Sequence, residues 1–478
     1  MTAQGAERPS YERAELGMST RAAEAAFDSE DLLARIARDL GRLSGSAAFV
    51  ALTWPVPSVP SERLLAAENE GDALLWAPPG DDEACGLGAA FTLSAAGAER
   101  FQSIHAQASE VWTQLDASLS DPLAPAPRFF GGFAFQAGQA QSPLWREFGD
   151  ARFVLPRLTY LKNREGAWLR LIVSGKAWSG SAFRSELEQL VQRALRALFT
   201  PSLSLEPARE LAREEGSAEA WAELVAQIQH EIAQGHAQKI VAARRLSLTL
   251  DRPLSPAAVQ ARLREDAPES TRFAIRVGNS TFLGATPEQL IRKRGLEIST
   301  EAVAGSISAD DATAATRLLE SDKDIREHEF VVSEILRLLG PLTSELSPAP
   351  RREVHRLRTV LHLRTPIQGK LREAGHVLEL VGRLHPTPAV GGVPTRAAID
   401  FITQHEPDER GWYTGPVGWF DAAGDGRFVV ALRSGVVFGA RAELYAGAGV
   451  VQASNAPSEF AETRWKLAAL LGALGVAG

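Results

Sequence analysis

Four apolar, strand-like segments in the second half of the chain constrain its fold more than any other feature. They are KIVAARRLSLTL (239–250), RFAIRVGNSTFLGA (272–285), FVVALRSGVVF (428–438) and AELYAGAGVVQ (442–452). Helical patterns at 318–339 and about 457–475 interrupt them. Strands in hairpin-like succession with helices between them favour an α+β architecture over a strictly alternating α/β one.

The first half of the chain gives weaker signals. Residues 1–28 lack apolar periodicity and are expected to form a loose tail, whereas DLLARIARDLGRL (31–43) has helical spacing. Short strand-like runs and a helix near 183–198 follow. The segment 201–217 is rich in Pro, Ser and charge, which predicts a surface loop. In FFGGFAFQ (129–136), two glycines within an aromatic strand indicate a bulge or close backbone packing.

A well-marked helix follows the predicted loop. Ser217 is suited to cap the segment AEAWAELVAQIQHEIAQ (218–234), whose apolar residues form one stripe. Gly235 is suited to end it. The sequence therefore predicts that the strand-rich half begins with a helix.

Charge and cysteine content exclude several classes of protein. Lys and Arg number 51 and Asp and Glu 59, a net charge of −8 that argues against non-specific binding to nucleic acid or an anionic membrane. Cys85 is the only cysteine, which excludes an internal disulfide and a zinc site built on several thiolates. There is no apolar signal-peptide core and no uncharged run of membrane-span length. We expect a cytoplasmic protein.

Two predicted helices carry acidic side chains that could bind a cation. Glu327 and Glu334 lie seven residues apart, so their carboxylates project from nearly the same helix face. Near the C-terminus, Glu459, Glu462 and Lys466 are spaced at i, i+3 and i+7. Carboxylates with few thiols or histidines nearby suit a hard ion such as Mg²⁺. Each cluster alone is more typical of a solvated helix face.

Three other charged residues stand in unusual places. Lys239 opens an apolar strand, where desolvation could make it a general base, although an edge-strand lysine in water gives the same pattern. Glu288 follows Thr286 and Pro287 where a strand is expected to end and a helix to begin. Arg433 interrupts a strand-like run and must pair with a structural carboxylate or an anionic ligand.

The segment YAGAG (445–449) is half of a dinucleotide-binding fingerprint. Its third glycine and the opening helix are missing, so we do not expect NAD. Its glycines could still let backbone N–H groups approach a carboxylate.

Taken in order, motifs from about Trp221 to Leu471 resemble the chorismate-utilising enzymes, and within that family most closely the isochorismate synthases. The segments that carry the resemblance are AQKIVAARR, FLGATPEQLIRKRG, STEAVAGSISAD, SDKDIREHEFVVSEI, VLHLRTPIQGKL, LHPTPAVGGVPTRAA, HEPDERGWYTGPVGWFDAAGDG, FVVALRSGVV and LYAGAGVVQASNAPSEFAETRWK. FFGGFAFQ in the first half is similar to theirs as well.

The resemblance implies one large α+β catalytic domain of two packed, mainly antiparallel sheets with helices outside. Residues 29–216 would form its N-terminal half, and residues 217–478 the chorismate-binding half that carries the active site. It also implies Mg²⁺-dependent conversion of chorismate to isochorismate, in which water adds at ring C2 as the C4 hydroxyl departs. Such a reaction needs a base and an acid.

The same resemblance assigns roles to individual residues. Lys239 matches the lysine that activates water, and Glu288 the acid that protonates the departing oxygen, for which its pKa must be raised. Glu327 and Glu462 match the Mg²⁺-binding glutamates, and Glu334 and Glu459 are weaker candidates for the same site. Further positions match those that hold or align the substrate: Val303, His362, Ala389, Tyr413, Arg433, Gly447, Gly449 and Lys466.

Two residues in the matching segments depart from the family pattern. Val303 replaces a more usual leucine and Ser306 a more usual threonine. The departures bear on how the nucleophile is positioned more than on the class of reaction.

Three other functions fit parts of the pattern. A salicylate synthase would keep the same lysine and glutamates and also eliminate pyruvate. An anthranilate or aminodeoxychorismate synthase is disfavoured by Lys239 and Ala389 and would usually need a glutaminase partner, which we therefore do not expect. A non-catalytic binding protein would have lost the base, acid or metal residues. We expect a monomer that binds chorismate and isochorismate.

Overall fold

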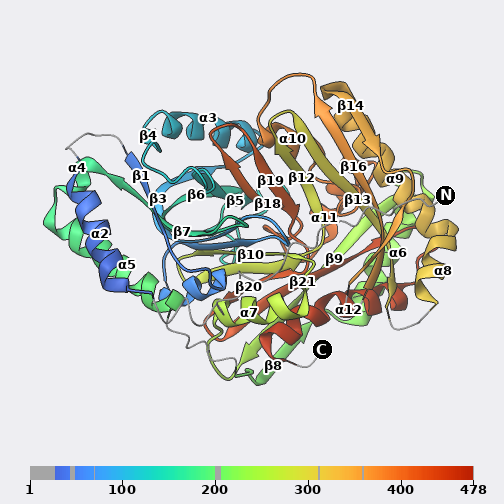
Figure 1. Cartoon of the computed structure of the whole chain (residues 1–478). Helices are drawn as coiled ribbons and strands as arrows, with labels where there is room; N and C mark the ends of the chain where they lie inside the picture. Colours follow the sequence, from blue (N-terminus) through green and yellow to red (C-terminus); the bar gives the residue numbers. More distant parts are fainter. Residues whose placement is uncertain are drawn as a thin grey trace, which may run out of the picture.

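The computed structural model describes residues 27–43, 49–68, 70–199, 206–309, 313–357 and 360–476. Helices surround a large, mainly antiparallel sheet (Figure 1), which confirms the predicted α+β class. No helix in these ranges is long and apolar enough to cross a membrane. The predicted tail, 1–28, lies almost entirely outside the described residues. The division of the domain between residues 216 and 217 stays a prediction.

The strands form one hydrogen-bonded network that branches at β6 (Ala151–Lys162). One edge of β6 pairs with β3 along its whole length. The other edge pairs with β5 through Ala151–Val154 and with β7 through Leu158–Lys162. The two predicted sheets are therefore two arms of a single network that share β6.

The first arm contains most strands of the N-terminal half and ends at the strand that begins with Lys239. Its strands, in bonded order, are β4 (Leu115–Asp116), β1 (Phe49–Pro55), β7 (Ala167–Ser174), β6, β3 (Glu83–Ala95), β2 (Ala73–Ala77), β10 (Thr271–Val277), β11 (Ser280–Thr286), β20 (Ser434–Phe438), β21 (Arg441–Val450) and β9 (Lys239–Leu250), with β8 (Glu210–Glu215) and β17 (Gly392–Val393) both on the last edge of β9.

The second arm leaves β6 through the paired-glycine strand. Its strands are β5 (Arg128–Phe133), β18 (Pro416–Asp421), β19 (Gly426–Val430), β12 (Gln289–Arg294), β13 (Glu297–Ser308) and β16 (Val360–Leu371), followed by β14 (Thr343–Pro348) and β15 (Glu353–Arg356). A Cβ on Gly131 of β5 would lie 2.0 Å from the carbonyl oxygen of Arg152, so the predicted close packing at these glycines is confirmed.

At two adjacent places a connection of two or three residues takes the chain from one arm to the other. Residues 287–288 join β11 of the first arm to β12 of the second, and residues 431–433 join β19 of the second arm to β20 of the first. Hydrogen bonds tie these two crossovers together. The Val430 N–H donates to the Glu288 carbonyl (3.1 Å), and the Thr286 hydroxyl donates to the Val430 carbonyl (2.6 Å).

Three large apolar cores hold the helices and the arms in place. One lies between the first arm and a helical layer, one packs helices onto the second arm, and an aromatic-rich core joins the arms through side chains such as Phe282 of β11 and Val429 of β19. The helices are α2 (Ser29–Gly41), η1 (Ser61–Ala67), α3 (Arg100–Trp112), α4 (Gly175–Trp178), α5 (Ser181–Phe199), α6 (Ala218–Ala233), α7 (Pro256–Asp266), α8 (Ala314–Glu320), α9 (Asp322–Leu339), η2 (Gly340–Leu342), α10 (Val377–Leu384), α11 (Thr395–His405) and α12 (Ala456–Leu474).

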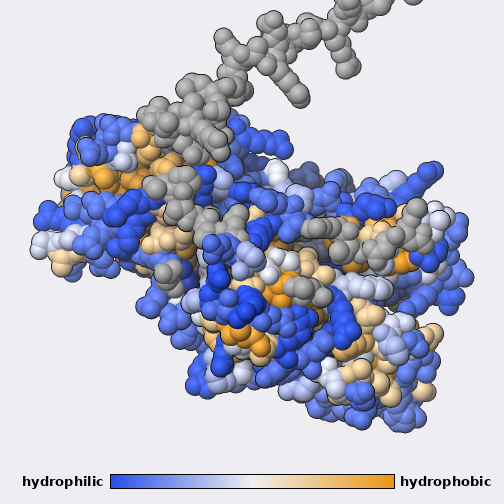
Figure 2. Space-filling model, turned by 90° about the horizontal axis from the view of Figure 1, so that it is seen from below, coloured by the Kyte–Doolittle hydropathy of each residue, from blue (hydrophilic) through white to orange (hydrophobic). Residues whose placement is uncertain are grey.

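Local signals explain where several helices begin and end. The Ser217 hydroxyl accepts from the Ala220 N–H to cap α6, and Gly235 follows with a φ of 77°, as predicted. Asn455 caps α12, and Gly475 ends it in the left-handed region. On the face seen in Figure 2, apolar side chains form separate patches between hydrophilic ones, as is usual for folded proteins, whose surfaces include much apolar area.

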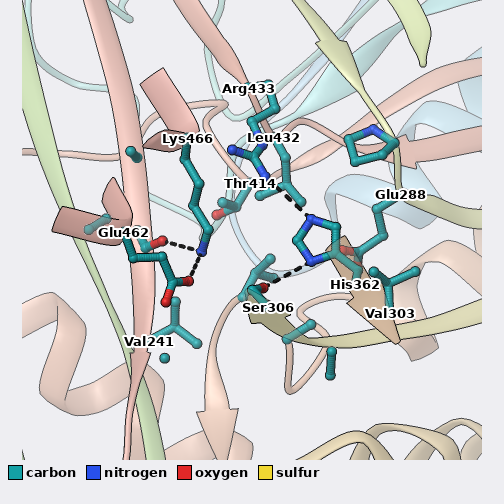
Figure 3. Close-up of a pocket in the computed structure, with 18 of the residues that line it drawn as sticks. Val241, Glu288, Val303, Ser306, His362, Thr414, Leu432, Arg433, Glu462 and Lys466 are labelled. Carbon is teal, nitrogen blue, oxygen red and sulfur yellow. Dashed lines mark hydrogen bonds and ion pairs between the residues drawn. The ribbon is translucent and has the colours of Figure 1, made fainter. Parts of the chain in front are cut away.

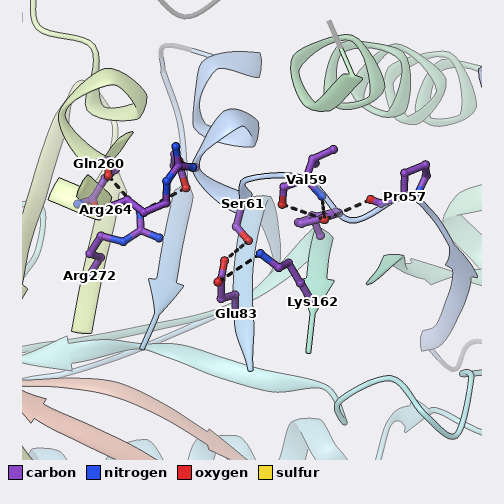
Figure 4. A network of polar contacts seen from close by, with 10 residues as sticks. Pro57, Val59, Ser61, Glu83, Lys162, Gln260, Arg264 and Arg272 are labelled. Carbon is purple, nitrogen blue, oxygen red and sulfur yellow. Dashed lines mark hydrogen bonds and ion pairs between the residues drawn. The ribbon is translucent and has the colours of Figure 1, made fainter. Parts of the chain in front are cut away.

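A buried charged network joins the N-terminal half to the C-terminal half. The Glu62 carboxylate of η1 is 1% exposed and pairs with Arg264 of α7 and, at 3.3 Å, with Arg272 of β10. Nearby, the Ser61 hydroxyl donates to Glu83 at 2.6 Å (Figure 4). Because a buried charge is costly without a partner, the two arginines stabilise the position of η1.

Four local predictions were wrong. No helix follows Thr286, because Pro287 and Glu288 form a crossover between two strands. Within the predicted loop 201–217, residues 210–215 form edge strand β8, held by its pairing with β9. The predicted helix 318–339 is two helices, since Ser321 ends α8 and caps α9. Arg433 lies in the second crossover, not within a strand.

Candidate active site

One cavity, at the place where the two crossovers meet β9, β21 and α12, collects all twelve predicted site residues (Figure 3). They come from strands of both arms, from the two crossovers, from helices α9 and α12 and from two loops. The residues are Lys239, Glu288, Val303, Glu327, His362, Ala389, Tyr413, Arg433, Gly447, Gly449, Glu462 and Lys466. Every described residue that lines this cavity follows residue 238, so the N-terminal half shapes it only indirectly.

Lys239 is the first residue of β9 and is buried in the cavity wall. Its ammonium group forms an ion pair with the Glu327 carboxylate on α9. Burial alone would raise the pKa of Glu327, but the charge and hydrogen bond of Lys239, together with the charges of Lys323 and Lys466, outweigh it and lower that pKa. Gly449 on the neighbouring strand makes room for the lysine, because a Cβ there would lie 2.7 Å from Lys239 Cε.

A second lysine–glutamate pair comes from α12. Lys466 Nζ lies 2.6 Å from Glu462 Oε1, one turn away, and donates a hydrogen bond to the Gly447 carbonyl at 2.8 Å. The pair therefore attaches the helix to β21. Lys239 and Lys466 thus neutralise the two carboxylates that the sequence assigns to a metal.

Glu288, on the first crossover, is fully enclosed and carries a strongly perturbed carboxyl group. Burial raises its pKa to about 8, and the carboxylate of Glu301 adds to the effect against the opposing charges of Lys239 and Lys466. The group is therefore protonated at neutral pH. A carboxylic acid that faces a cavity in this state can donate a proton.

His362 of β16 is held neutral and in one tautomer. Burial and then the charge of Arg433 keep its pKa well below the usual value. Arg433 Nη2 lies 3.4 Å from His362 Nε2 and can only donate, so Nε2 accepts and Nδ1 carries the hydrogen. Nδ1 then donates to the Ser306 hydroxyl at 2.9 Å, with the Gly305 carbonyl at 3.3 Å.

Arg433, on the second crossover, is a cation without a carboxylate partner. No ion pair to it exists within the described ranges, and its φ of 49° is left-handed. Burial lowers its pKa to about 10, so it remains charged. Of the two partners that the sequence allowed for it, an anionic ligand fits the geometry.

Tyr413 also lines the cavity. Burial raises its pKa to about 12, so its hydroxyl keeps the proton and can donate. Its ring stacks on Tyr445 with the ring centroids 5.2 Å apart. Val303 of β13 and Ala389 supply small apolar surface to the cavity.

The cavity residues fit a magnesium ion that binds together with a substrate. Glu327 and Glu462 offer only oxygen ligands, which Mg²⁺ prefers. Burial is the first cause that raises the pKa values of Asp324 and Glu459; the charges of Glu327 and Glu462 raise that of Asp324 further, and the charge of Glu462 raises that of Glu459, so negative charge is concentrated there. The described residues contain no cluster of three or more His, Cys, Asp or Glu that could enclose a metal unaided. A site with one or two carboxylates, water and substrate oxygens is usual for Mg²⁺.

The two weaker metal candidates do not line the cavity. Glu334 faces a separate surface pocket and is held by Arg337 at 2.7 Å. Glu459 is buried one turn before Glu462 on α12, and Lys323 Nζ lies 3.8 Å from its carboxylate. The seven-residue spacing of Glu327 and Glu334 places them two turns apart, which is too far for one ion to bind both in this fold.

Three residues at or beside the cavity have no separate signal in the sequence. Arg410 lines it and donates hydrogen bonds to the carbonyls of Val241 and Val390 while pairing with Glu406. Thr414 also lines it. Glu301 lies behind Glu288. The RGWYT motif contains Arg410 and Thr414, and only the resemblance could have drawn attention to it.

Comparison with known proteins gives a consistent result. The sequence matches the family described as chorismate binding enzyme over residues 35–475. It is 39% identical over 406 residues to the salicylate biosynthesis isochorismate synthase of Pseudomonas aeruginosa, with 82% of each chain covered. It is 33% identical over 427 residues to the isochorismate synthase MenF of Bacillus subtilis, covering 86% of this chain and 89% of that one.

Solved structures with the same fold include two related enzymes. MenF, the menaquinone-specific isochorismate synthase from Escherichia coli, superposes with a TM-score of 0.77 at 28% identity, covering 93% of this chain and 99% of that one. Anthranilate synthase component I from Streptococcus pneumoniae has a TM-score of 0.63 at 20% identity, covering 89% and 92%, and shares the fold.

Proposed function

The chain belongs to the family of chorismate binding enzymes, and on that premise we propose that it converts chorismate to isochorismate with Mg²⁺. The burial of Glu288, which raises its pKa to about 8 in the same cavity that holds Lys239, is the observation that carries the proposal. Together they supply an acid and, once the lysine is neutral, a base. The isochorismate synthases among its relatives support the same reaction.

In the proposed reaction a water oxygen bonds to ring C2 while the bond between C4 and its hydroxyl oxygen breaks, and the ring double bonds shift. Lys239 takes the proton from the attacking water. Glu288 gives its proton to the departing oxygen, which leaves as water. One water enters and one leaves, so the net reaction is an isomerisation.

The remaining cavity residues would hold the substrate. Arg433 and Tyr413 donate to one substrate carboxylate, and Lys466 adds positive charge beside α12. Neutral His362, fixed by Ser306, faces the ring, while Val303 and Ala389 align the attacking water. The glycines of β21 let the substrate and Lys239 approach the backbone.

Magnesium bound by Glu327 and Glu462 would hold the ring carboxylate and offset the charge of a doubly anionic substrate. Both glutamates pair with lysines. Metal affinity is therefore expected to reflect competition with these lysines. We further propose that the enzyme acts in the cytoplasm, as a monomer and without a glutaminase subunit.

The test is to incubate the purified protein with chorismate and Mg²⁺, without ammonia, and to separate the products while assaying pyruvate. Isochorismate in reversible balance with chorismate, and no pyruvate, is the expected result. Stoichiometric pyruvate with salicylate would instead make it a salicylate synthase, and turnover only with ammonia would overturn the role of Lys239. The Lys239→Ala variant is the control, and it should bind chorismate without converting it.

A further inference from the structure

Within the described ranges only two residues other than glycine have a left-handed backbone, and both line the cavity. They are Thr414, with a φ of 62°, and Arg433, with a φ of 49°. The Thr414 N–H donates to the carbonyl of Ala431, two residues before Arg433 (3.1 Å). A β-branched residue is strained in this region and persists there only when its surroundings hold it.

The side-chain hydroxyl of Thr414 is buried and lacks a hydrogen-bond partner among the described residues. The residue is 2% exposed. A buried hydroxyl without a partner is costly, and such groups in folded proteins usually have one. Figure 3 shows Thr414 in the same part of the cavity as Lys466 and Arg433.

The neighbouring groups indicate what the missing partner is. Arg433 and Lys466 can only donate hydrogen bonds, and Tyr413 keeps its hydroxyl proton. A ligand group that satisfies all of these donors must be an acceptor with several lone pairs and a negative charge, which describes a carboxylate. A hydroxyl beside them can add one more donor to the same group.

Resting on the function proposed above, we propose that Thr414 is a further substrate-binding residue, whose hydroxyl donates to the substrate carboxylate paired with Arg433. The strained backbone of Thr414 then turns its short side chain toward the bound carboxylate. The inference concerns affinity for the substrate and not the proton transfers.

The test compares steady-state kinetics with chorismate for the wild type, Thr414→Val and Thr414→Ser. Valine keeps the shape and the β-branch but removes the hydroxyl, so KM should rise about 10-fold or more while kcat changes far less. Serine keeps the donor and should restore most of the affinity. Thr387→Val is the matched control, since Thr387 also has a buried hydroxyl without a partner but does not line the cavity. Its KM should be unchanged.

The outcomes separate this inference from the proposed function. If the wild type converts chorismate and Thr414→Val has the same KM, only the role of Thr414 is wrong. An equal rise in KM for the valine and serine variants would also overturn it, because the effect would then be steric. If the wild type neither binds nor converts chorismate, the proposed function is wrong and this inference fails with it.

Discussion

Lys239 Cε lies against the backbone of Gly449, so close that a Cβ on the glycine would approach it to 2.7 Å. The same Cβ would lie 3.2 Å from Nζ and 3.4 Å from Glu327 Oε1. The glycine therefore sets the position of the lysine as much as it leaves space for a ligand. Sequence reasoning had assigned Gly449 only to the substrate.

Gly449→Ala should displace Lys239 and lower kcat by about 100-fold, because a shift of about 1 Å in a reacting group can cost that much. Its fold should be unaffected, as judged by circular dichroism and melting temperature. Gly472→Ala is the control, since a Cβ there meets nothing within 4 Å. Normal kcat in Gly449→Ala would show that Lys239 tolerates displacement.

The rate should fall at alkaline pH because Glu288 must be protonated to act as the acid. Its pKa of about 8 predicts that kcat/KM falls as the pH rises through 8. The measurement is a pH–rate profile at saturating Mg²⁺. A rate that falls only above pH 10 would assign the acid to another group.

The same group affects stability with a defined sign. Unfolded Glu288 ionises at its ordinary pKa of 4.5, while the folded protein keeps the proton up to about pH 8. The contribution of Glu288 to the free energy of unfolding is fully present below pH 4.5 and is lost as the pH rises through 8. Compared with Glu288→Gln, the wild type should therefore lose unfolding free energy across this window, as measured by urea titrations.

Glu301→Gln should move the alkaline limb of the pH–rate profile to lower pH. Glu301 Oε1 accepts from the N–H of Gln289, the residue after Glu288, and its charge raises the pKa of Glu288. Glutamine can keep that hydrogen bond without the charge. Glu353→Gln serves as the control, because Glu353 contacts the same Arg364 from an exposed position. If the alkaline limb of the profile does not move in Glu301→Gln, burial alone raises the pKa of Glu288.

Glu462→Gln should raise the Mg²⁺ concentration for half-maximal rate by ~10-fold or more, since even residues behind metal ligands contribute that much to affinity. Glu334→Gln should leave this concentration unchanged, because Glu334 lies outside the cavity and pairs with Arg337. Magnesium titrations of the initial rate measure both. If the two variants change this Mg²⁺ concentration equally, Glu462 does not bind the metal.

Glu62→Ala should cost about 3–5 kcal/mol of unfolding free energy, because it leaves buried Arg272 without its carboxylate. Denaturant titration measures the loss. Glu206→Gln removes an exposed partner of Arg252 and should change stability by less than ~0.5 kcal/mol. A loss below about 1 kcal/mol in Glu62→Ala would mean that solvent reaches the arginines.

The sequence predicted those elements whose signals are local. The α6 helix carries its cap, its apolar stripe and its stop within one segment, and it was placed correctly. Strand β8 was missed because it has almost no apolar side chains and exists only through pairing with β9. Pro287 and Glu288 are typical of a helix start, and nothing nearby in the sequence distinguishes that from a crossover between two strands.

The sequence predicted which residues lie together in one cavity, but not their physical state. The patterns around Glu327 and Glu462 were each more typical of a solvated helix face, and only the ordered motifs brought them together. Neither the raised pKa of Glu288 nor the unpartnered charge of Arg433 could be read from spacing, because both arise where the two crossovers meet. The contribution of Glu301 likewise depends on contacts across β12 and β13.

The branch at β6 also has a consequence for synthesis of the chain on the ribosome. Strands β2 and β5 emerge early, but their outer partners β10 and β18 come only at 271–277 and 416–421. The nascent N-terminal half therefore exposes two open strand edges while most of the chain is still being made. Open edges promote pairing with other chains, so this half is exposed to wrong pairing throughout the time in which the C-terminal half is made.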